Sequence, residues 1–532
     1  MKWGFFKKKQ TNYPADQYSK DYINEILEAL KDENEITKIP ISFSFLLTSS
    51  EKLKLRTAKV LLESVSKLNN SHLFKLDKIF RERTSFDWTY DWKNESPKNL
   101  LLPTMSEDEK LTILGFCTFH PNGYFREKAL HDLDSFSSGK ELPYLILRCN
   151  DWVREVRETA KKYVESRISI KYVEHLVQNL PLIFQLKNAE RDDHSELFEK
   201  VVNLLSQKES LPFIDQGTKS EISKIRYFCY KVIIYSKMFN KKMLVNYLKA
   251  EREPHSRLLL FNEIINDISQ DEFNEYYSIL KKDKFPMIRA KILERYYSFY
   301  PDQSTCELEK ALVDKSGAIR SIARFLLKKQ NITNFAPYYE EFIKQKSNVN
   351  LRGAILGLGE VGNTEQVKLI IPFIKDNRVG IVKAAIRSIM MIDANKYIDN
   401  FIEMLNHEHK GVSKEAMRCL LTTSCANKKD FLDRIYNQSN YEHTKYNAAI
   451  LLCSLPKWES IQYIIEFYVN KTDSNIYNLG RSQFTNWLAN FNRTFDTPSR
   501  TQVEAIKKIL DQFGNDLEKS EKRHIEFCIK GF

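Results

Sequence analysis

The spacing of apolar residues through the middle of the chain is that of amphipathic helices. In the segment 287–293, Ile288, Ile292 and Leu293 are separated so that they share one side of a helix. Another helical stretch, Glu272–Lys281, precedes this segment, and a short polar turn separates the two. A helix of about a dozen residues, a turn, a second helix and a linker add up to a period of roughly thirty residues. We therefore predict a repeating unit of two antiparallel helices.

A basic residue near the start of the second helix recurs with the period of this unit. Successive members are 31 or 32 residues apart over eight positions: Arg226, Arg257, Arg289, Arg320, Arg352, Lys383, Lys414 and Lys445. A fixed period between about 20 and 50 residues is typical of stacked-repeat proteins, in which one supersecondary unit is copied along an axis.

An acidic residue precedes many of these cations at a near-constant distance. Pairs six residues apart are Asp151 and Arg157, Glu251 and Arg257, Asp283 and Arg289, Asp314 and Arg320, and Glu408 and Lys414; Asp376 and Lys383 are seven apart. This distance is too long for an intrahelical pair, so the acid belongs to the turn and the cation to the second helix. The acid can cap that helix, and the cation can reach the acid of its own or a neighbouring unit. We predict a structural ladder of such contacts; the alternative is a basic groove for nucleic acid.

Two segments carry a resemblance to a known family. Residues 351–363 (LRGAILGLGEVGN), with Ile374-Lys375-Asp376 and Val382-Lys383-Ala384-Ala385, resemble HEAT repeats, in particular the bacterial HEAT-like repeats of phycobilisome-lyase type. Asp151–Ala160 matches the turn and second helix of such a repeat. The resemblance covers roughly 270–530 and 100–166. It implies an all-α fold, a right-handed α-solenoid of about a dozen antiparallel helix pairs (an armadillo-like, HEAT-type superhelix).

The beginning of the chain is less regular than the rest. Helical patterns at Asp16–Leu30, Lys52–Leu68 and Ser71–Arg83 indicate divergent helix pairs, and an aromatic, charged insertion begins at residue 85. A terminal unit of a solenoid must present one polar outer face, so an atypical end is expected. We predict a helical cap over 1–100 and a continuous solenoid over 101–532.

The composition limits the kinds of protein that this chain can be, but it does not indicate an activity. The 82 basic and 70 acidic residues leave a net charge of +12, which is spread along the chain and permits polyanion binding without requiring it. The eight cysteines show no metal-ligand spacing, and no secretory or membrane-spanning stretch is apparent. These features predict a cytoplasmic protein with reduced cysteines, without a bound metal or other cofactor.

Short motifs that suggest chemistry are better explained by structure. Residues 357–362 match GxGxxG, but they end a predicted helix that no strand precedes, so we expect glycines that cap that helix in the left-handed conformation and allow close packing. His407 and His409 flank Glu408 in a turn with no further ligand nearby. Asp151, Trp152, Arg154 and Arg157 have the residue types of a HEAT-like DNA glycosylase, yet Asp151 and Arg157 are in ladder register.

Two aromatic segments are candidates for partner contacts. Trp88, Tyr90 and Trp92 lie in the insertion; they either anchor a protein partner or fold back onto the first units, and we favour the second. At the start of the chain, aromatic and basic residues could contact an anionic membrane surface, although a docked terminus is the simpler interpretation. The residues concerned are Trp3, Phe5, Phe6, Lys7, Lys8 and Lys9.

Because no catalytic constellation is present, the sequence favours a non-enzymatic scaffold or adaptor that binds a protein partner along the solenoid face. The alternative is a nucleic-acid-binding protein or HEAT-like DNA-repair enzyme with a basic concave surface.

Overall fold

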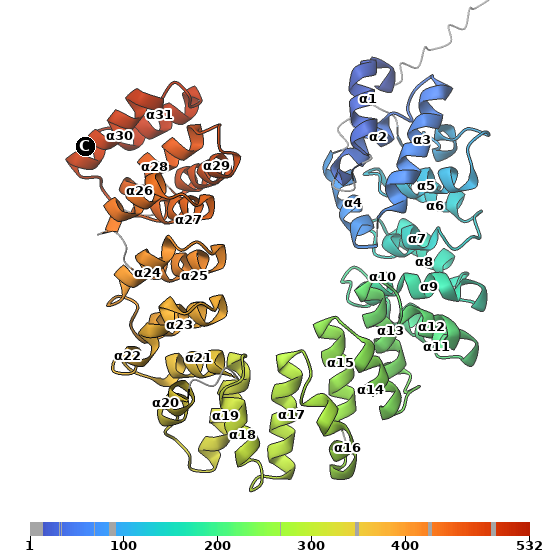
Figure 1. The fold of residues 1–532 in the computed structure, drawn as a ribbon. Helices are drawn as coiled ribbons and strands as arrows, with labels where there is room; N and C mark the ends of the chain where they lie inside the picture. The colour runs from blue at the N-terminus through green and yellow to red at the C-terminus, as the bar shows by residue number, and fades with distance from the viewer. Residues whose placement is uncertain are drawn as a thin grey trace, which may run out of the picture. The chain divides into compact units, whose positions relative to one another are not determined.

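The computed structural model describes residues 14–30, 32, 35–68, 70–83, 92–266, 268–345, 350–423, 428–490 and 496–532. Over these residues the secondary structure is helical and contains no strand (Figure 1). The predicted all-α fold is therefore confirmed. The chain divides into two compact units, Met1–Ile268 and Ser269–Phe532, hereafter unit 1 and unit 2. The predicted boundary near residue 100, between a cap and a continuous solenoid, stays a prediction.

The α-helices of unit 1 are α1 (Lys20–Ala29), α2 (Ile39–Ser44), α3 (Glu51–Ser66), α4 (Asn70–Arg83), α5 (Glu107–Cys117), α6 (Gly123–Leu133), α7 (Leu142–Arg148), α8 (Arg154–Glu165), α9 (Val173–Gln178), α10 (Leu180–Lys187), α11 (Ser195–Leu205), α12 (Leu211–Gly217), α13 (Ser223–Tyr235), α14 (Lys241–Ala250) and α15 (Pro254–Ile265).

The α-helices of unit 2 are α16 (Gln270–Leu280), α17 (Pro286–Phe299), α18 (Thr305–Leu312), α19 (Gly317–Lys329), α20 (Ala336–Lys344), α21 (Leu351–Val361), α22 (Val367–Ile370), α23 (Val379–Asp393), α24 (Ile398–Leu405), α25 (Lys410–Leu420), α26 (Lys429–Gln438), α27 (Glu442–Cys453), α28 (Lys457–Val469), α29 (Ser474–Ala489), α30 (Arg500–Phe513) and α31 (Lys519–Cys528). The short 3₁₀ helix η7 (Ile371–Lys375) extends α22.

Within unit 2, second helices of successive pairs pack against one another. Helix α21 contacts α23, α23 contacts α25, and α25 contacts α27, while α20, α24 and α26 each pack against the second helix that follows them (Figure 1). This stacking of antiparallel helix pairs is the arrangement predicted from the apolar spacing and the 31-residue period. Residues at equivalent positions of the second helices consequently share one side of the stack.

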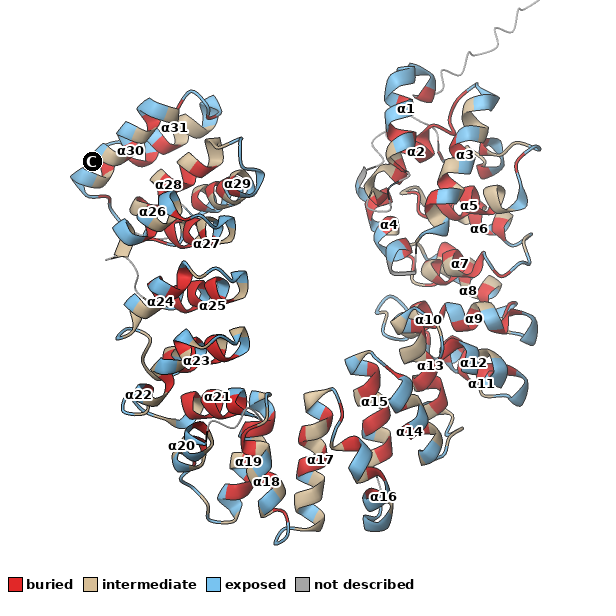
Figure 2. Ribbon diagram, viewed as in Figure 1, coloured by how far each residue is buried: buried red, intermediate tan, exposed pale blue. Residues whose placement is uncertain are grey.

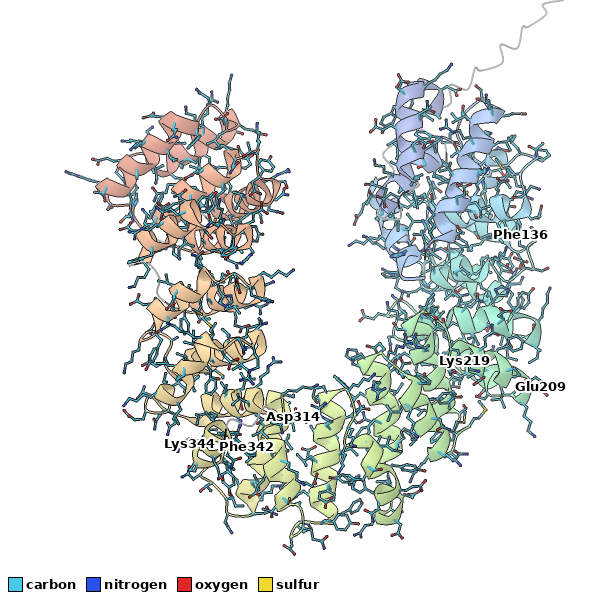
Figure 3. All side chains as sticks on the ribbon, viewed as in Figure 1. Phe136, Glu209, Lys219, Asp314, Phe342 and Lys344 are labelled. Carbon is cyan, nitrogen blue, oxygen red and sulfur yellow. The ribbon has the colours of Figure 1, made fainter. Side chains whose placement is uncertain are left out.

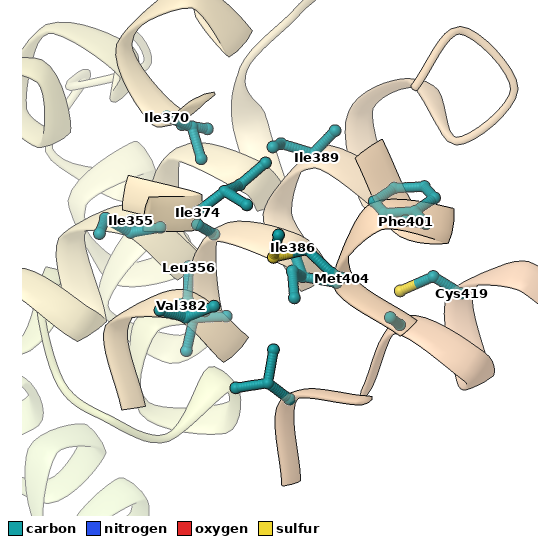
Figure 4. Close-up of a cluster of buried hydrophobic side chains, with 14 of the residues drawn as sticks. Ile355, Leu356, Ile370, Ile374, Val382, Ile386, Ile389, Phe401, Met404 and Cys419 are labelled. Carbon is teal, nitrogen blue, oxygen red and sulfur yellow. The ribbon is translucent and has the colours of Figure 1, made fainter. Parts of the chain in front are cut away.

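One buried hydrophobic cluster of unit 2 runs through successive helix pairs from α17 to α29, and a second cluster joins α28 to α31. Figure 2 shows buried residues concentrated on the helix faces that meet neighbouring helices. In Figure 4, Ile355 from α21, Ile370 from α22, Ile386 from α23, Phe401 from α24 and Cys419 from α25 belong to one buried cluster. Since burying one such large apolar side chain contributes about 1.5–3 kcal/mol, each pair depends on its neighbours for stability.

Gly357 and Gly359 of the GxGxxG motif lie within α21 and allow close helix packing, and Gly362 is the C-cap of this helix. A Cβ atom on Gly357 would overlap the ring of Tyr339, and one on Gly359 would overlap Ser388. The prediction that these residues close a helix is confirmed. The predicted left-handed cap is wrong, because the C-cap residue Gly362 has φ −77° and ψ 175°, an extended conformation open to any residue.

Unit 1 departs from regular pairing between residues 169 and 206. The chain forms three helices there, α9, α10 and α11. The break after α9 coincides with Pro181 in the first turn of α10, because proline lacks the N–H that a continuing helix would need. Helix α10 contacts both α7 and α13, so this irregular unit lies between two regular parts of unit 1.

None of the helices among the described residues has both the length and the apolar content needed to cross a membrane. The described cysteines are free; Cys306 is exposed, Cys453 is partly buried and the other five are buried.

Candidate functional site

The paired cations of the ladder lie in the first turn of a second helix and bind in two directions. Arg226 Nε and Nη2 donate to the carboxylate of Glu251 at 2.9 and 2.8 Å, and its Nη1 donates to the Ser220 carbonyl at 2.8 Å. Arg289 repeats the pattern, with Nη2 2.9 Å from Asp314 Oδ1 and Nη1 2.9 Å from the Asp283 carbonyl. The cation therefore reaches the carboxylate of the following unit and the backbone of its own turn. Of the two acids that the sequence left open, the one in the neighbouring unit is the partner of Arg226 and Arg289.

One cation of this kind was missed by the sequence interpretation. Arg126 Nε and Nη2 donate to the carboxylate of Asp151 at 3.1 and 2.6 Å, and its Nη1 donates to the His120 carbonyl at 2.9 Å. The signal was available, because Arg126 precedes Arg157 by 31 residues. Arg157 itself donates to the Asp151 carbonyl at 2.8 Å, and its Nε lies 3.8 Å from Asp192.

Two further members make the same backbone contact with the turn that precedes their helix. Arg257 is buried, and its Nη1 donates to the carbonyls of Leu248 and Glu251. Arg320 Nη1 donates to the Asp314 carbonyl at 2.6 Å, but its carboxylate partner is Glu360 at the end of α21, which also accepts from Arg324 at 2.8 Å.

The turn acids hold the backbone of the turn as well as a cation. In each case a carboxylate oxygen accepts the backbone N–H two residues later, at 2.7–3.0 Å: Asp151 from Val153, Glu251 from Glu253, Asp283 from Phe285, Asp314 from Ser316 and Asp376 from Arg378. Asp314, labelled in Figure 3, lies between α18 and α19. Burial raises the pKa of Glu251, but bonds from Arg226 and from the Glu253 and Arg252 backbone outweigh burial and hold the pKa at about 2.

The pairing ends beyond Arg320. Arg352, Lys383, Lys414 and Lys445 form no ion pair or side-chain hydrogen bond with any other described residue, although they keep the 31-residue register. We call these four residues the basic row. Glu408, expected to pair with Lys414, is exposed and also has no ion-pair partner among the described residues.

The turns that follow Arg352, Lys414 and Lys445 differ from those that follow the paired cations. Both Asp376 oxygens accept from Arg378, at 2.8 Å each, so a residue within the same turn occupies the acid that would face Arg352. For three of the paired cations, the carboxylate partner lies 25 residues later in the chain. The same step from Lys414 and Lys445 leads to Ser439 and Asn470. A hydroxyl or an amide cannot neutralise an ammonium group, so these two lysines stay uncompensated.

The basic row lies along α21, α23, α25 and α27, near the N-terminus of each helix. Arg352 and Lys414 are exposed, whereas Lys383 and Lys445 are partly buried. Helix N-termini carry a partial positive charge, which adds to the field of the side chains. Because packed helix axes are about 8–10 Å apart, the row presents positive charges about 10 Å apart over roughly 30 Å.

The aromatic insertion contributes to the core at the one predicted residue that the structure describes. Trp92 is buried, with its ring centroid 4.1 Å from that of His120 and 4.9 Å from that of Phe125. A side chain in this position is not exposed to a partner, because neighbouring rings already cover it. Trp88 and Tyr90 lie outside the described residues, as do Trp3, Phe5, Phe6, Lys7, Lys8 and Lys9.

The histidine cluster acts within its own turn. His407 Nδ1 accepts the His409 N–H at 2.9 Å, and His409 Nδ1 accepts the Gly411 N–H at 3.0 Å, which caps α25. No group of three or more metal-ligating side chains comes together within the part of the chain that the structure describes.

The residues that resemble a glycosylase site are engaged in structural contacts. The Asp151 side chain is buried and binds Arg126, Arg148 and the Val153 N–H. Arg154 donates to Glu158 at 2.6 Å on the same helix. Trp152 is strongly exposed, at 63%.

Comparisons with known proteins give distant structural likenesses. No family model matches the sequence, and no curated protein matches it. The chain is similar to a chain of the S. pombe condensin Cnd3–Cnd2 subcomplex, with 14% identity and a TM-score of 0.37 over 96% of this chain and 79% of the other. It is similar to yeast importin-β (Kap95p), with 10% identity and a TM-score of 0.33 over 94% and 66%. Similarity to Kap121p has 14% identity and a TM-score of 0.23 over 97% and 55%. The chain thus spans slightly under two thirds of importin-β and just over half of Kap121p.

Proposed function

We propose that the chain is a non-catalytic scaffold that binds an extended, acidic segment of a protein partner along the basic row. One observation carries the proposal. Arg352, Lys383, Lys414 and Lys445 keep the ladder register without an ion-pair partner among the described residues, whereas Arg126, Arg226, Arg289 and Arg320 each bind a carboxylate.

The free-energy difference between the paired ladder cations and the basic row is large enough to direct a partner to the basic row. A ladder cation must give up a carboxylate before it can bind a partner, and breaking a buried ion pair costs about 3–5 kcal/mol. The cations of the basic row have no such bond to break. An acidic segment laid along the row would therefore gain its contacts without disrupting the stack.

The spacing of the row suits an extended peptide. An extended chain advances about 3.3 Å per residue, so charges about 10 Å apart match acidic residues at every third position. Four such contacts cover about ten residues of partner. Each exposed contact is worth about 0.2–1 kcal/mol, so the row supplies register and selectivity, and affinity also requires neighbouring contacts.

The same spacing disfavours nucleic acid as the occupant. Duplex DNA carries one negative charge per roughly 1.7 Å, a far denser array than four cations over roughly 30 Å. Acidic side chains also lie in the same part of unit 2: Glu408 is exposed, and Glu415 on α25 accepts from Arg387 at 2.7 Å. A continuous phosphate backbone would meet these carboxylates as well as the cations.

Binding of a labelled peptide with glutamate at every third position tests the proposal, with fluorescence anisotropy as the readout at low ionic strength. The combined variant R352Q/K383Q/K414Q/K445Q should bind this peptide about tenfold more weakly than the wild type. A matched control, K242Q/K249Q/K507Q/K508Q, removes the same charge from exposed lysines outside the row and should bind like the wild type.

Two results would overturn the proposal. The first is equal weakening by both variants, since the effect would then be one of net charge. The second is stronger binding of a duplex oligonucleotide than of the peptide, with a steep salt dependence that the row variant abolishes, which would establish the nucleic-acid alternative.

A further inference from the structure

A pocket in unit 1, separate from the basic row, has the size of a small-molecule site. Its volume is about 680 Å³, within the range of about 300–1,000 Å³ typical of ligand pockets. Helix α4, the end of α7 with the turn after it, helix α10 and the segment after α10 line it. The irregular unit that Pro181 interrupts therefore forms one wall.

Five side chains behind and beside the pocket form one connected ion network. Asp151 binds Arg126 at 2.6 Å and Arg148 at 2.8 Å. Arg148 also binds Asp77 at 2.6 Å, and Asp77 binds Arg81 at 2.9 Å. We call these residues the arginine network; Asp77, Arg81 and Arg148 line the pocket.

The arginine network holds three guanidinium groups against two carboxylates. Arg148 is 1% exposed and Arg126 is 4% exposed, so the excess positive charge is largely withheld from water. The Nε atoms of Arg81 and Arg148 are buried and have no hydrogen-bond acceptor among the described residues. Burial and the nearby Arg148 cation lower the pKa of Arg81 below its usual range. An uncompensated buried charge is unfavourable, and an anion at the pocket would relieve it.

A second cation approaches the pocket from the opposite wall. Arg81 lies 4.9 Å from the ring centroid of Trp152, and Arg191 lies 5.5 Å from the same centroid. Arg191 is exposed, and its Nη1 makes one hydrogen bond, to the Asn150 carbonyl at 3.2 Å. Two guanidinium groups held on one indole repel each other, and a shared anion would convert that repulsion into attraction.

The rest of the lining mixes apolar side chains with polar ones, among them Lys78, Glu82 and Gln185. Two of its apolar side chains are strongly exposed, Phe74 on α4 at 49% and Trp152 at 63%. Large exposed apolar side chains gathered in a pocket are typical of a surface that a ligand covers. An inorganic anion would leave these side chains in water, so the occupant needs an apolar body.

We infer that this pocket binds an organic anion whose sulfonate, phosphate or carboxylate group lies between Arg81 and Arg191 and whose aromatic or aliphatic body covers Phe74 and Trp152. The inference does not depend on the basic row, which belongs to unit 2. It assigns the pocket a ligand of small-molecule size.

A pair of fluorescent probes separates the charge requirement from apolar binding. 8-Anilinonaphthalene-1-sulfonate carries a sulfonate, and N-phenyl-1-naphthylamine is a closely related neutral molecule. We expect the full-length protein to bind the sulfonate saturably at one site, and R191Q to weaken that binding about tenfold. The control R154Q removes an exposed arginine two residues from Trp152 that does not line the pocket, and should change binding less than about twofold.

The neutral probe should bind more weakly than the sulfonate and be insensitive to R191Q. W152A is a second variant, and it should keep the fold because Trp152 is strongly exposed. Its melting temperature checks this. W152A should also weaken sulfonate binding several-fold. Equal sulfonate affinity of R191Q and R154Q, or equal affinity of the two probes for the wild type, would refute the inference.

Discussion

Glu251 illustrates how a single turn carboxylate stabilises the stack. Its folded-state pKa of about 2 lies below the ordinary value of 4.5 because Arg226 and two backbone N–H groups bind the ionised form. A depressed acid pKa contributes stability that is complete above the unfolded value and is lost as the pH falls through the folded value. The loss from this residue therefore falls between about pH 4.5 and pH 2.

The variant E251Q should lower the free energy of unfolding by about 2 kcal/mol at pH 7, and the difference from the wild type should shrink steadily below pH 4.5. Urea unfolding of both proteins at a series of pH values measures this difference. The remaining acids titrate alike in both proteins, so their contribution drops out when the two free energies are subtracted. E199Q, at an exposed acid with no ion-pair partner among the described residues, serves as the control and should have little effect. A difference that is constant with pH would show that Glu251 acts through packing alone.

At the scale of helices, close approach in unit 2 depends on particular glycines. A Cβ atom on Gly353 of α21 would overlap the carbonyl oxygen of Val313 at the end of α18, and a backbone atom cannot move aside as a side chain can. Gly380, near the start of α23, has nothing within 4 Å of the same position. The two positions form a natural pair for comparison.

The variant G353A should destabilise unit 2 by at least about 2 kcal/mol, because α21 must shift away from α18. G380A should be neutral or stabilising by about 0.5 kcal/mol, since alanine is the better helix former. Chemical unfolding followed by circular dichroism measures both effects. If G380A destabilises the protein as much as G353A, the contact with the Val313 backbone is not the cause of the destabilisation by G353A.

At the scale of the whole molecule, a stack of pairs is stabilised mainly by contacts between neighbours. In such a chain a local defect propagates only to adjacent units. Hydrogen exchange followed by mass spectrometry should therefore show faster exchange in α13, α14 and α15 for E251Q, with α23, α25 and α27 unchanged. G353A should instead speed exchange in α23, α25 and α27 and leave α13, α14 and α15 unchanged. A uniform increase over both units in either variant would show that the two units unfold as one.

Much of the architecture was predictable because it depends on local patterns that recur. The apolar spacing around Ile288 and the period of the basic residues led to stacked helix pairs. The six-residue offset between Asp283 and Arg289 placed the acid in the turn and the cation in the helix. Pro181 also marks the irregular unit of α9, α10 and α11, although its effect on pairing was not anticipated.

The contacts of the charged residues were less predictable, because they depend on which side chains the stack brings together. Arg352 and Arg289 hold the same register, but only Arg289 finds a carboxylate. Asp376, the acid of the turn that follows Arg352, binds Arg378 instead, an interaction between residues two positions apart that the repeat pattern does not contain. The absence of acids at Ser439 and Asn470 was visible in the sequence, and becomes meaningful only once the 25-residue step from cation to partner is known.

The amino-acid order by itself determined the helical class, the two-helix unit and the register of its cations, since these follow from periodicity along one chain. Only the tertiary structure decided that the basic row is free of acidic partners among the described residues, and that Arg81 and Arg148 meet Asp77 and Asp151 beside a pocket. Charge balance in a folded protein is a property of neighbours in space, and residues 71 positions apart, such as Asp77 and Arg148, become neighbours only through packing.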